Sequence, residues 1–297
     1  MPRSVHFPSD RESCAADLYL PSDDGPGGGW PVVVMAHGIG AERRFGLAPF
    51  ARRFADQGMA SLVFDYRHFG ESTGEPRNLV SPAGQVADFL AAMEFVRADP
   101  RLDEARIGLW GTSFSGGHVL KVASSRPSGL RAVVSQIPFV SGWASTLAYP
   151  LRYHVPAVMW GLADGLGSLF GRSPVTVEVA RKGGRFALLA SPDSWDGYIS
   201  LVPEGEGWSG RVPARVFLEI LRYHPGRVAH RIQVPTLLLA ASRDAICPIG
   251  ATRRVARRVP RGEIREFPVG HFEPYHGEWF ERFVGAAADF LEGQLGD

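Results

Sequence analysis

Two hydrophobic patterns alternate along the chain. Short apolar runs rich in β-branched residues, typical of buried strands, occupy residues 31–36, 60–65, 106–110, 130–135, 234–241 and 263–268. Stretches with apolar residues three or four positions apart, typical of helices, occupy residues 45–54, 83–96 and 278–295. The alternation predicts an α/β fold in which helices flank a mostly parallel central β-sheet. The first 21 residues predict antiparallel strands at one edge of that sheet.

One long segment breaks the alternation. Residues 139–233 contain helical pieces separated by prolines, from Pro150 to Pro213, and the segment is too long for a plain loop. We therefore predict an α/β core built from residues 1–138 and 234–297, with residues 139–233 inserted as a helical cap. The alternative is an irregular excursion at the periphery of the core.

A serine at the end of a predicted strand is the strongest chemical signal. The sequence Gly111-Thr-Ser113-Phe-Ser115-Gly116 joins the strand at 106–110 to a helix, and small residues surround Ser113. Such a tight strand-to-helix turn lifts a serine hydroxyl clear of the sheet, where the helix N-terminus stabilises developing negative charge. We predict Ser113 as the nucleophile rather than Ser115, because only Ser113 follows a glycine by two positions.

A serine nucleophile requires a base and a carboxylate that orients the base. Asp244 follows the predicted strand at 234–241, and His271 follows the strand at 263–268. Since parallel strands end at the same edge of a sheet, both side chains should emerge near Ser113. We predict Asp244 and His271 as catalytic residues, with His276 as the alternative base and Asp193 or Asp196 as alternative acids.

Two backbone N–H groups should bind the oxyanion. The first is that of Phe114, directly after the nucleophile. The second comes from the glycine-containing loop His37-Gly-Ile39-Gly40 after the strand at 31–36, where we predict Ile39. The competing interpretation of that loop is an ordinary glycine turn.

Together these motifs make the chain resemble an α/β-hydrolase over nearly its whole length. The matching features are Gly111-Thr-Ser-Phe-Ser-Gly116, Arg243-Asp244 with Pro248, Gly270-His271-Phe272 and His37-Gly38. The resemblance points to the dienelactone-hydrolase-like and acylamino-peptidase-like esterase branch. It implies a serine hydrolase that cleaves a carboxylic ester or thioester through an acyl-enzyme, without cofactor or metal. The alternatives are an acyltransferase with the same triad and a non-catalytic ligand-binding module.

Aromatic residues are dense in the predicted cap, and we expect Trp143, Tyr149 and Tyr153 to bind an uncharged acyl group of a small-molecule substrate. In the loop after residue 64 we expect Asp65 to act structurally, through Arg67 and Ser72.

Composition narrows the remaining function classes. The formal net charge of +1 gives no field that would attract nucleic acid or an anionic membrane. The two cysteines, Cys14 and Cys247, are too few for a disulfide scaffold. The N-terminus lacks the apolar core of a signal peptide. We expect a cytoplasmic protein with no nucleic-acid or membrane partner, and the sequence leaves a homodimer open.

Overall fold

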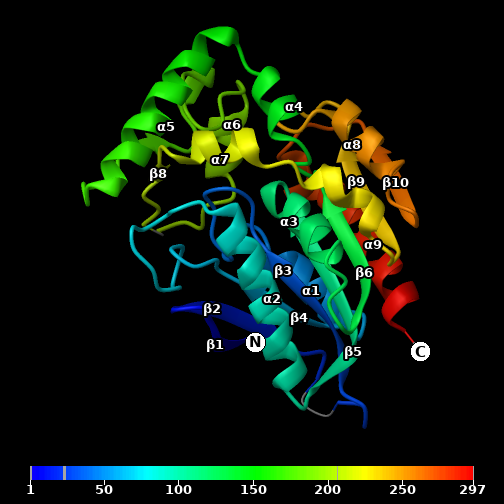
Figure 1. The fold of residues 1–297 in the computed structure, drawn as a ribbon. Helices are drawn as coiled ribbons and strands as arrows, with labels where there is room; N and C mark the ends of the chain where they lie inside the picture. The colour runs from blue at the N-terminus through cyan, green and yellow to red at the C-terminus, as the bar shows by residue number, and fades with distance from the viewer. Residues whose placement is uncertain (1, 23–24, 206, 297) are drawn as a thin grey trace.

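An eight-stranded sheet forms the centre of the protein (Figure 1), in a computed structural model that describes residues 2–22, 25–205 and 207–296. The strands lie in the order β1-β2-β4-β3-β5-β6-β9-β10. Their bounds are β1 Arg3–Ser9, β2 Glu12–Tyr19, β3 Trp30–Ala36, β4 Ala60–Phe64, β5 Leu102–Thr112, β6 Leu130–Gln136, β9 Thr236–Ala241 and β10 Gly262–Phe267. At one edge β2 pairs antiparallel with both β1 and β4. The other neighbouring pairs of this sheet, in the order β4-β3-β5-β6-β9-β10, are parallel. The predicted α/β fold with a mostly parallel sheet is confirmed.

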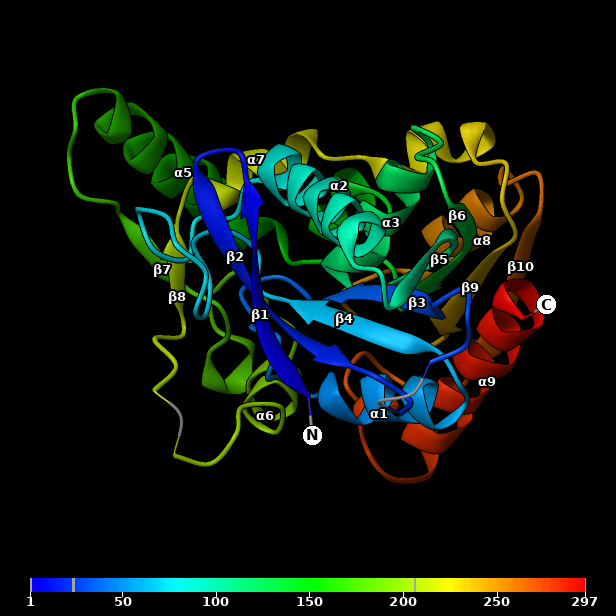
Figure 2. The same ribbon diagram turned by 90° about the horizontal axis from the view of Figure 1, so that it is seen from below.

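Helices cover both faces of this sheet (Figure 2). α1 (Ala48–Asp56) and α9 (Gly277–Leu295) lie on one face, and α2 (Pro82–Ala98), α3 (Phe114–Ala123) and α8 (Ile249–Ala256) lie on the other. The sequence pattern predicted that α1 begins at residue 45, but the helix begins at Ala48. Pro49 fits its first turn, because backbone N–H groups there have no partner within the helix. None of the described helices combines the length and the apolar character needed to cross a lipid bilayer.

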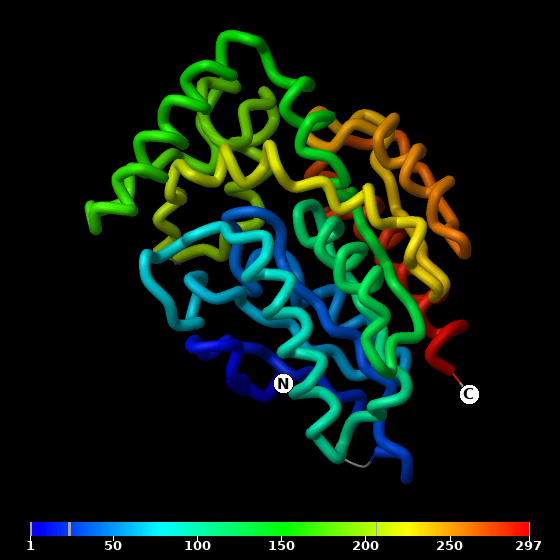
Figure 3. Tube along the Cα trace, in the orientation of Figure 1, coloured from blue at the N-terminus to red at the C-terminus, as the bar shows by residue number. Residues whose placement is uncertain are grey.

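Residues 139–233 lie over the carboxyl ends of the parallel strands. Figure 3 shows the chain leaving the sheet after β6, running across this end of the molecule and returning to β9. The segment contains α4 Gly142–Leu147, η1 Leu151–Tyr153, α5 His154–Leu169, β7 Thr176–Glu178, η2 Lys182–Gly184, α6 Ser194–Ile199, β8 Arg211–Pro213, α7 Val216–Arg222 and η3 Pro225–Arg231, where η marks a 3₁₀ helix. A further 3₁₀ turn, η4 Glu273–Tyr275, precedes α9.

The small antiparallel sheet β7–β8 was not predicted, since strands of three residues are too short to show a period. The division at residues 138/139 and 233/234 stays a prediction, and its outer ends, Met1 and Asp297, lie outside the described residues.

A buried arginine holds the loops near the sheet edge. The Arg43 guanidinium pairs with the buried carboxylate of Asp65, and the Arg43 backbone N–H donates to the same carboxylate at 2.6 Å. Arg67, predicted to bind Asp65, instead pairs with Asp88 at 2.8 Å. The predicted link to Ser72 is present, since its hydroxyl donates to the Asp65 carbonyl oxygen at 2.7 Å.

We expect Arg43→Met to lower the free energy of unfolding by about 3–5 kcal/mol, because it leaves the Asp65 carboxylate buried without its cation. The control is Arg53→Met, which removes an exposed pair with Glu281 (2.5 Å) and should cost less than about 1 kcal/mol. Urea unfolding of both variants measures the difference. Equal losses would show that the buried pair is not a structural requirement.

Candidate active site

Ser113 sits on a strained turn between β5 and α3. Its backbone lies in the positive-φ region, with φ 56° and ψ −116°, which non-glycine residues rarely adopt. The turn also brings the backbone of Ser115 against Gly111, where an added Cβ would lie 2.3 Å from the Ser115 carbonyl oxygen. Gly111 therefore has no room for a side chain. The Ser113 N–H donates to the Gln136 carbonyl at 2.9 Å, which fixes the turn to the neighbouring strand.

The structure brings Ser113, His271 and Asp244 together at this edge. His271 Nε2 lies 2.9 Å from Ser113 Oγ, and His271 Nδ1 lies 2.7 Å from Asp244 Oδ2. The other carboxylate oxygen of Asp244 accepts the N–H groups of Ile246 (2.7 Å) and Cys247 (2.8 Å). An ionised carboxylate can only accept, so Nδ1 carries the proton and Nε2 is free to accept the serine hydroxyl proton.

The alternative residues lie elsewhere. His276 Nε2 is hydrogen-bonded to the Ser200 hydroxyl at 2.9 Å, and Asp193 and Asp196 line an outer groove together with His276. Ser115 is fully buried, and its hydroxyl is 2.7 Å from that of Tyr66. None of these groups makes a hydrogen bond to Ser113 among the described residues.

Phe114 occupies the position expected of an oxyanion donor. It is the first residue of α3, and the first N–H groups of a helix have no intrahelical acceptor. The Ser113 side chain does not cap them. On the neighbouring loop, a Cβ added to Gly38 would lie 3.3 Å from Ser113 Cβ, so the loop passes directly beside the serine.

Two aromatic side chains from residues 139–233 hold the loop that carries Ile39. The Tyr198 hydroxyl donates to the Ile39 carbonyl at 2.8 Å, and Trp208 Nε1 donates to the Gly40 carbonyl at 3.3 Å. The two rings stack on each other with centroids 4.8 Å apart. The sequence identified both only as cap aromatics, and no local motif signals that they fix this loop.

Two tyrosines brace the residues on either side of Ser113. The Tyr275 hydroxyl is hydrogen-bonded to Thr112, and the Tyr66 hydroxyl to Ser115. Burial raises the pKa of both phenols, so both remain neutral hydrogen-bonding groups. No local sequence motif signals either of these two contacts.

A buried polar chain also lies beneath the first turn of α3. His118 Nε2 is 3.0 Å from Gln85 Oε1, and His118 Nδ1 is 2.7 Å from the Tyr223 hydroxyl. Burial lowers the pKa of His118 to about 3, so the ring is neutral, donates through Nε2 and accepts through Nδ1. Its ring packs edge-on to Phe114, with centroids 4.7 Å apart. We therefore interpret His118 as a structural residue.

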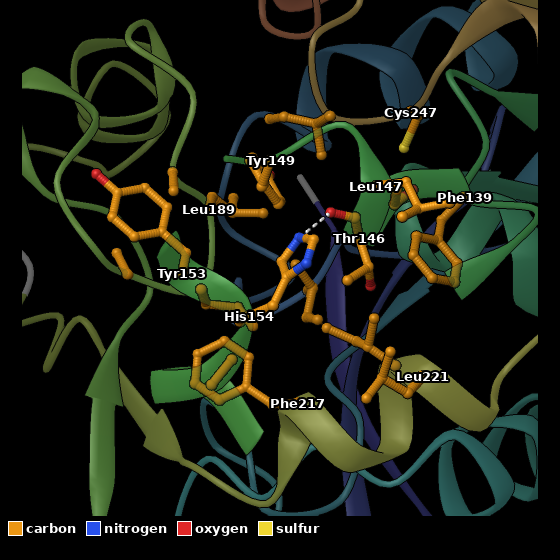
Figure 4. Close-up of a pocket in the computed structure, with 18 of the residues that line it drawn as sticks. Phe139, Thr146, Leu147, Tyr149, Tyr153, His154, Leu189, Phe217, Leu221 and Cys247 are labelled. Atoms are coloured by element: carbon orange, nitrogen blue, oxygen red, sulfur yellow. Dashed lines mark hydrogen bonds between the residues drawn. The ribbon is translucent and has the colours of Figure 1, made fainter. Parts of the chain in front are cut away.

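A cavity of about 340 Å³ opens beside Ser113. Figure 4 shows Tyr149, Tyr153, Leu189 and Phe217 around it, and most of its wall is apolar. Trp143 also lines it, so all three residues predicted to bind substrate lie on this wall. The volume falls within the range of small-molecule sites.

A second cavity, of about 30 Å³, is bounded by Ser113, His271 and Tyr275. A space of this size holds about one or two water molecules.

A metal ion fits this site poorly. The ligand atoms of Asp244, Cys247 and His271 lie within 4.8 Å of one another. However, Asp244 and His271 are hydrogen-bonded to each other. Burial together with the Asp244 charge raises the pKa of the Cys247 thiol well above its usual value. Thiols bind metals as thiolates, so a protonated Cys247 is a weak ligand.

Comparison with known proteins identifies relatives along almost the whole chain. The family model described as serine aminopeptidase, S33, matches residues 31–273. The quorum-quenching protein AidA of Acinetobacter baumannii is 42% identical over 98% of this chain and 94% of its own. The thiohydrolase aneE of Aspergillus aculeatus is 37% identical over 94% of this chain and 88% of its own. The crystal structure of the α/β-hydrolase GrgF from a Penicillium species superposes with a TM-score of 0.85 at 20% identity, covering all of both chains, which supports the fold.

We expect both cysteines to resist alkylation in the native protein. Cys14 is buried beside the Asp88 carboxylate and Cys247 beside that of Asp244, and each environment raises the thiol pKa. Iodoacetamide should therefore label the native protein at pH 8 at least about tenfold more slowly than the urea-unfolded chain, because the thiolate is the reacting form. Rapid native labelling of Cys247 would indicate a thiolate in the cavity and contradict this assignment.

Proposed function

The chain belongs to the serine aminopeptidase S33 family of α/β-hydrolases, and on that premise we propose that it cleaves a carboxylic ester or thioester through an acyl-enzyme on Ser113. One observation carries the proposal: a continuous hydrogen-bond chain from Ser113 through His271 to Asp244, beside an apolar cavity. This arrangement has the donors and acceptors of a nucleophile, a base and an orienting acid.

The geometry supports a two-step reaction. As Ser113 Oγ attacks the substrate carbonyl carbon, His271 Nε2 takes the hydroxyl proton and Asp244 stabilises the imidazolium. The backbone N–H groups of Ile39 and Phe114 receive the oxyanion. When the tetrahedral intermediate collapses, the imidazolium proton passes to the leaving oxygen or sulfur. A water molecule then gives a proton to Nε2 and attacks the acyl carbon. As the bond from this carbon to Ser113 Oγ breaks, the imidazolium returns the proton to Oγ and the acid is released.

The cavity supports an uncharged, apolar acyl group as the part of the substrate that is recognised. Trp143, Tyr149 and Tyr153 would contact that group. The Tyr149 hydroxyl is buried and makes no hydrogen bond of good geometry to the described residues, although the Ala190 backbone lies beside it. It is therefore available to donate to a substrate oxygen.

The second cavity can hold the water molecule that hydrolysis requires. The space beside His271 is about 30 Å³, enough for about one or two water molecules. The name of one relative, a thiohydrolase, fits the proposed hydrolysis of a thioester. A competing acyltransferase would divert the acyl group to an added nucleophile.

We expect Ser113→Ala to lower kcat for p-nitrophenyl butyrate and for an acyl thioester by at least about 10⁴-fold, because no other hydroxyl among the described residues is hydrogen-bonded to His271. The matched control is Ser115→Ala, which removes a buried hydroxyl two residues away and should keep kcat within about tenfold. Circular dichroism checks that both variants fold. Full activity in Ser113→Ala would exclude the proposed mechanism. The absence of turnover by the wild-type protein on a panel of esters and thioesters would favour a ligand-binding module.

We expect kcat/KM to rise along a series of p-nitrophenyl esters by up to about 0.8 kcal/mol per methylene until the cavity is filled. Ala157→Leu adds bulk to the cavity wall and should move the optimum to a shorter chain. Ala163→Leu, on the exposed side of the same helix, should leave the optimum unchanged. A series without an optimum, or one that both variants alter equally, would argue against the cavity as the acyl site.

A further inference from the structure

The exposed large hydrophobic side chains of the described residues all lie within one part of the protein, residues 143–199. Most belong to α5 or its ends, and Figure 1 shows α5 at the outer edge of the molecule. Exposed apolar side chains gathered in one part of a protein mark a candidate interaction site.

The inner face of α5 packs against the rest of the protein. Gly161 and Asp164 are buried, and an added Cβ at Gly161 would lie 2.9 Å from Leu218 of α7. The Asp164 carboxylate pairs with Arg215 at 2.7 Å and accepts the Val175 N–H at 3.0 Å. These contacts fix the rotation of the helix, so its opposite face is held toward solvent.

That opposite face carries a regular apolar stripe. Its members are spaced by four, three, four and three residues, and they are 47–77% exposed: Val155, Met159, Leu162, Leu166 and Leu169. A repeat averaging 3.5 residues lets a helix pack against a second helix in a coiled-coil-like pair. The exposed Val158 and Trp160 flank the stripe on the same helix. A helix that lies on a membrane carries a polar face rich in lysine and arginine. α5 contains no lysine or arginine.

We propose that α5 pairs antiparallel with α5 of a second copy of this chain, across a twofold axis near Leu162. A twofold axis allows one self-complementary surface to serve both copies, and Leu162 is the central member of the stripe. The exposed surfaces of the stripe, Leu151 and Phe170 together amount to roughly 800 Å² per copy. One partner in a standard interface buries about the same area. Antiparallel packing also places each helix C-terminus, with its partial negative charge, beside the N-terminus of the partner helix, with its partial positive charge. This proposal does not depend on the proposed function.

The proposed α5–α5 interface lies next to the acyl cavity. Val158 lies beside the stripe, is partly exposed and lines the acyl cavity. The interface would therefore adjoin the outer wall of the cavity without containing Ser113, His271 or Asp244.

Sedimentation velocity over a wide concentration range tests the pairing. The wild-type protein should sediment as a dimer, and Leu162→Glu should raise the dissociation constant at least about 100-fold, because two carboxylates would meet at the axis. The matched control is Ile199→Glu on α6, an exposed hydrophobic residue outside the stripe, which should leave the dimer unchanged. A wild-type monomer, or a dimer that Leu162→Glu does not weaken, overturns the proposal. A monomer that co-sediments with phosphatidylglycerol vesicles would assign the stripe to a membrane instead.

Disulfide cross-linking tests the geometry, since both native cysteines are buried. With oxidised glutathione, Leu162→Cys should give a covalent dimer, and so should the double variant Val155→Cys/Leu169→Cys. Val155→Cys alone should not, because antiparallel pairing holds the two copies of this position about 20 Å apart. Efficient cross-linking of Val155→Cys alone would contradict the antiparallel arrangement.

Discussion

The backbone of Ser113 is the constraint on which the rest of the site depends. A non-glycine residue at φ 56° and ψ −116° is unfavourable, and the surrounding structure must hold it there. Gly111 lets the helix approach the strand, and Tyr275 and Tyr66 fix the residues on either side. The strain has a chemical use, because it points the hydroxyl at His271 and leaves the first N–H groups of α3 open.

Residues 139–233, which lie over the strand ends, contribute to both the acyl cavity and the oxyanion loop of the proposed reaction. They supply most of the apolar wall of the large cavity, and through Tyr198 and Trp208 they hold the loop that carries Ile39. In the proposed reaction, substrate binding and oxyanion binding would thus be mechanically connected through this one segment. A movement of this segment would alter the acyl cavity and the Ile39 N–H together.

The features predicted from the sequence are those that follow from local pattern and chain order. Ser113, Asp244 and His271 each follow a recognisable strand, and parallel strands end at one edge, so their meeting point could be inferred. The tyrosine braces could not, because Tyr66 and Ser115 are 49 residues apart and Thr112 and Tyr275 are 163 apart, with no shared motif.

The burial of several polar side chains could not be predicted from the sequence either. Periodicity assigned an apolar inner face to α2, yet Gln85 and Asp88 are buried there because His118 and Arg67 satisfy them. The partner of Asp65 was misassigned for a similar reason. Arg67 is nearer in sequence, but the fold places Arg43 against the carboxylate.

The most direct test of the central claim is to find where a covalent inhibitor attaches. After treatment with a fluorophosphonate, digestion and mass spectrometry should find one adduct per chain, at Ser113, because only this hydroxyl is hydrogen-bonded to His271 among the described residues. An adduct at Ser115 or at another residue, or no adduct on a folded and active enzyme, would contradict the account.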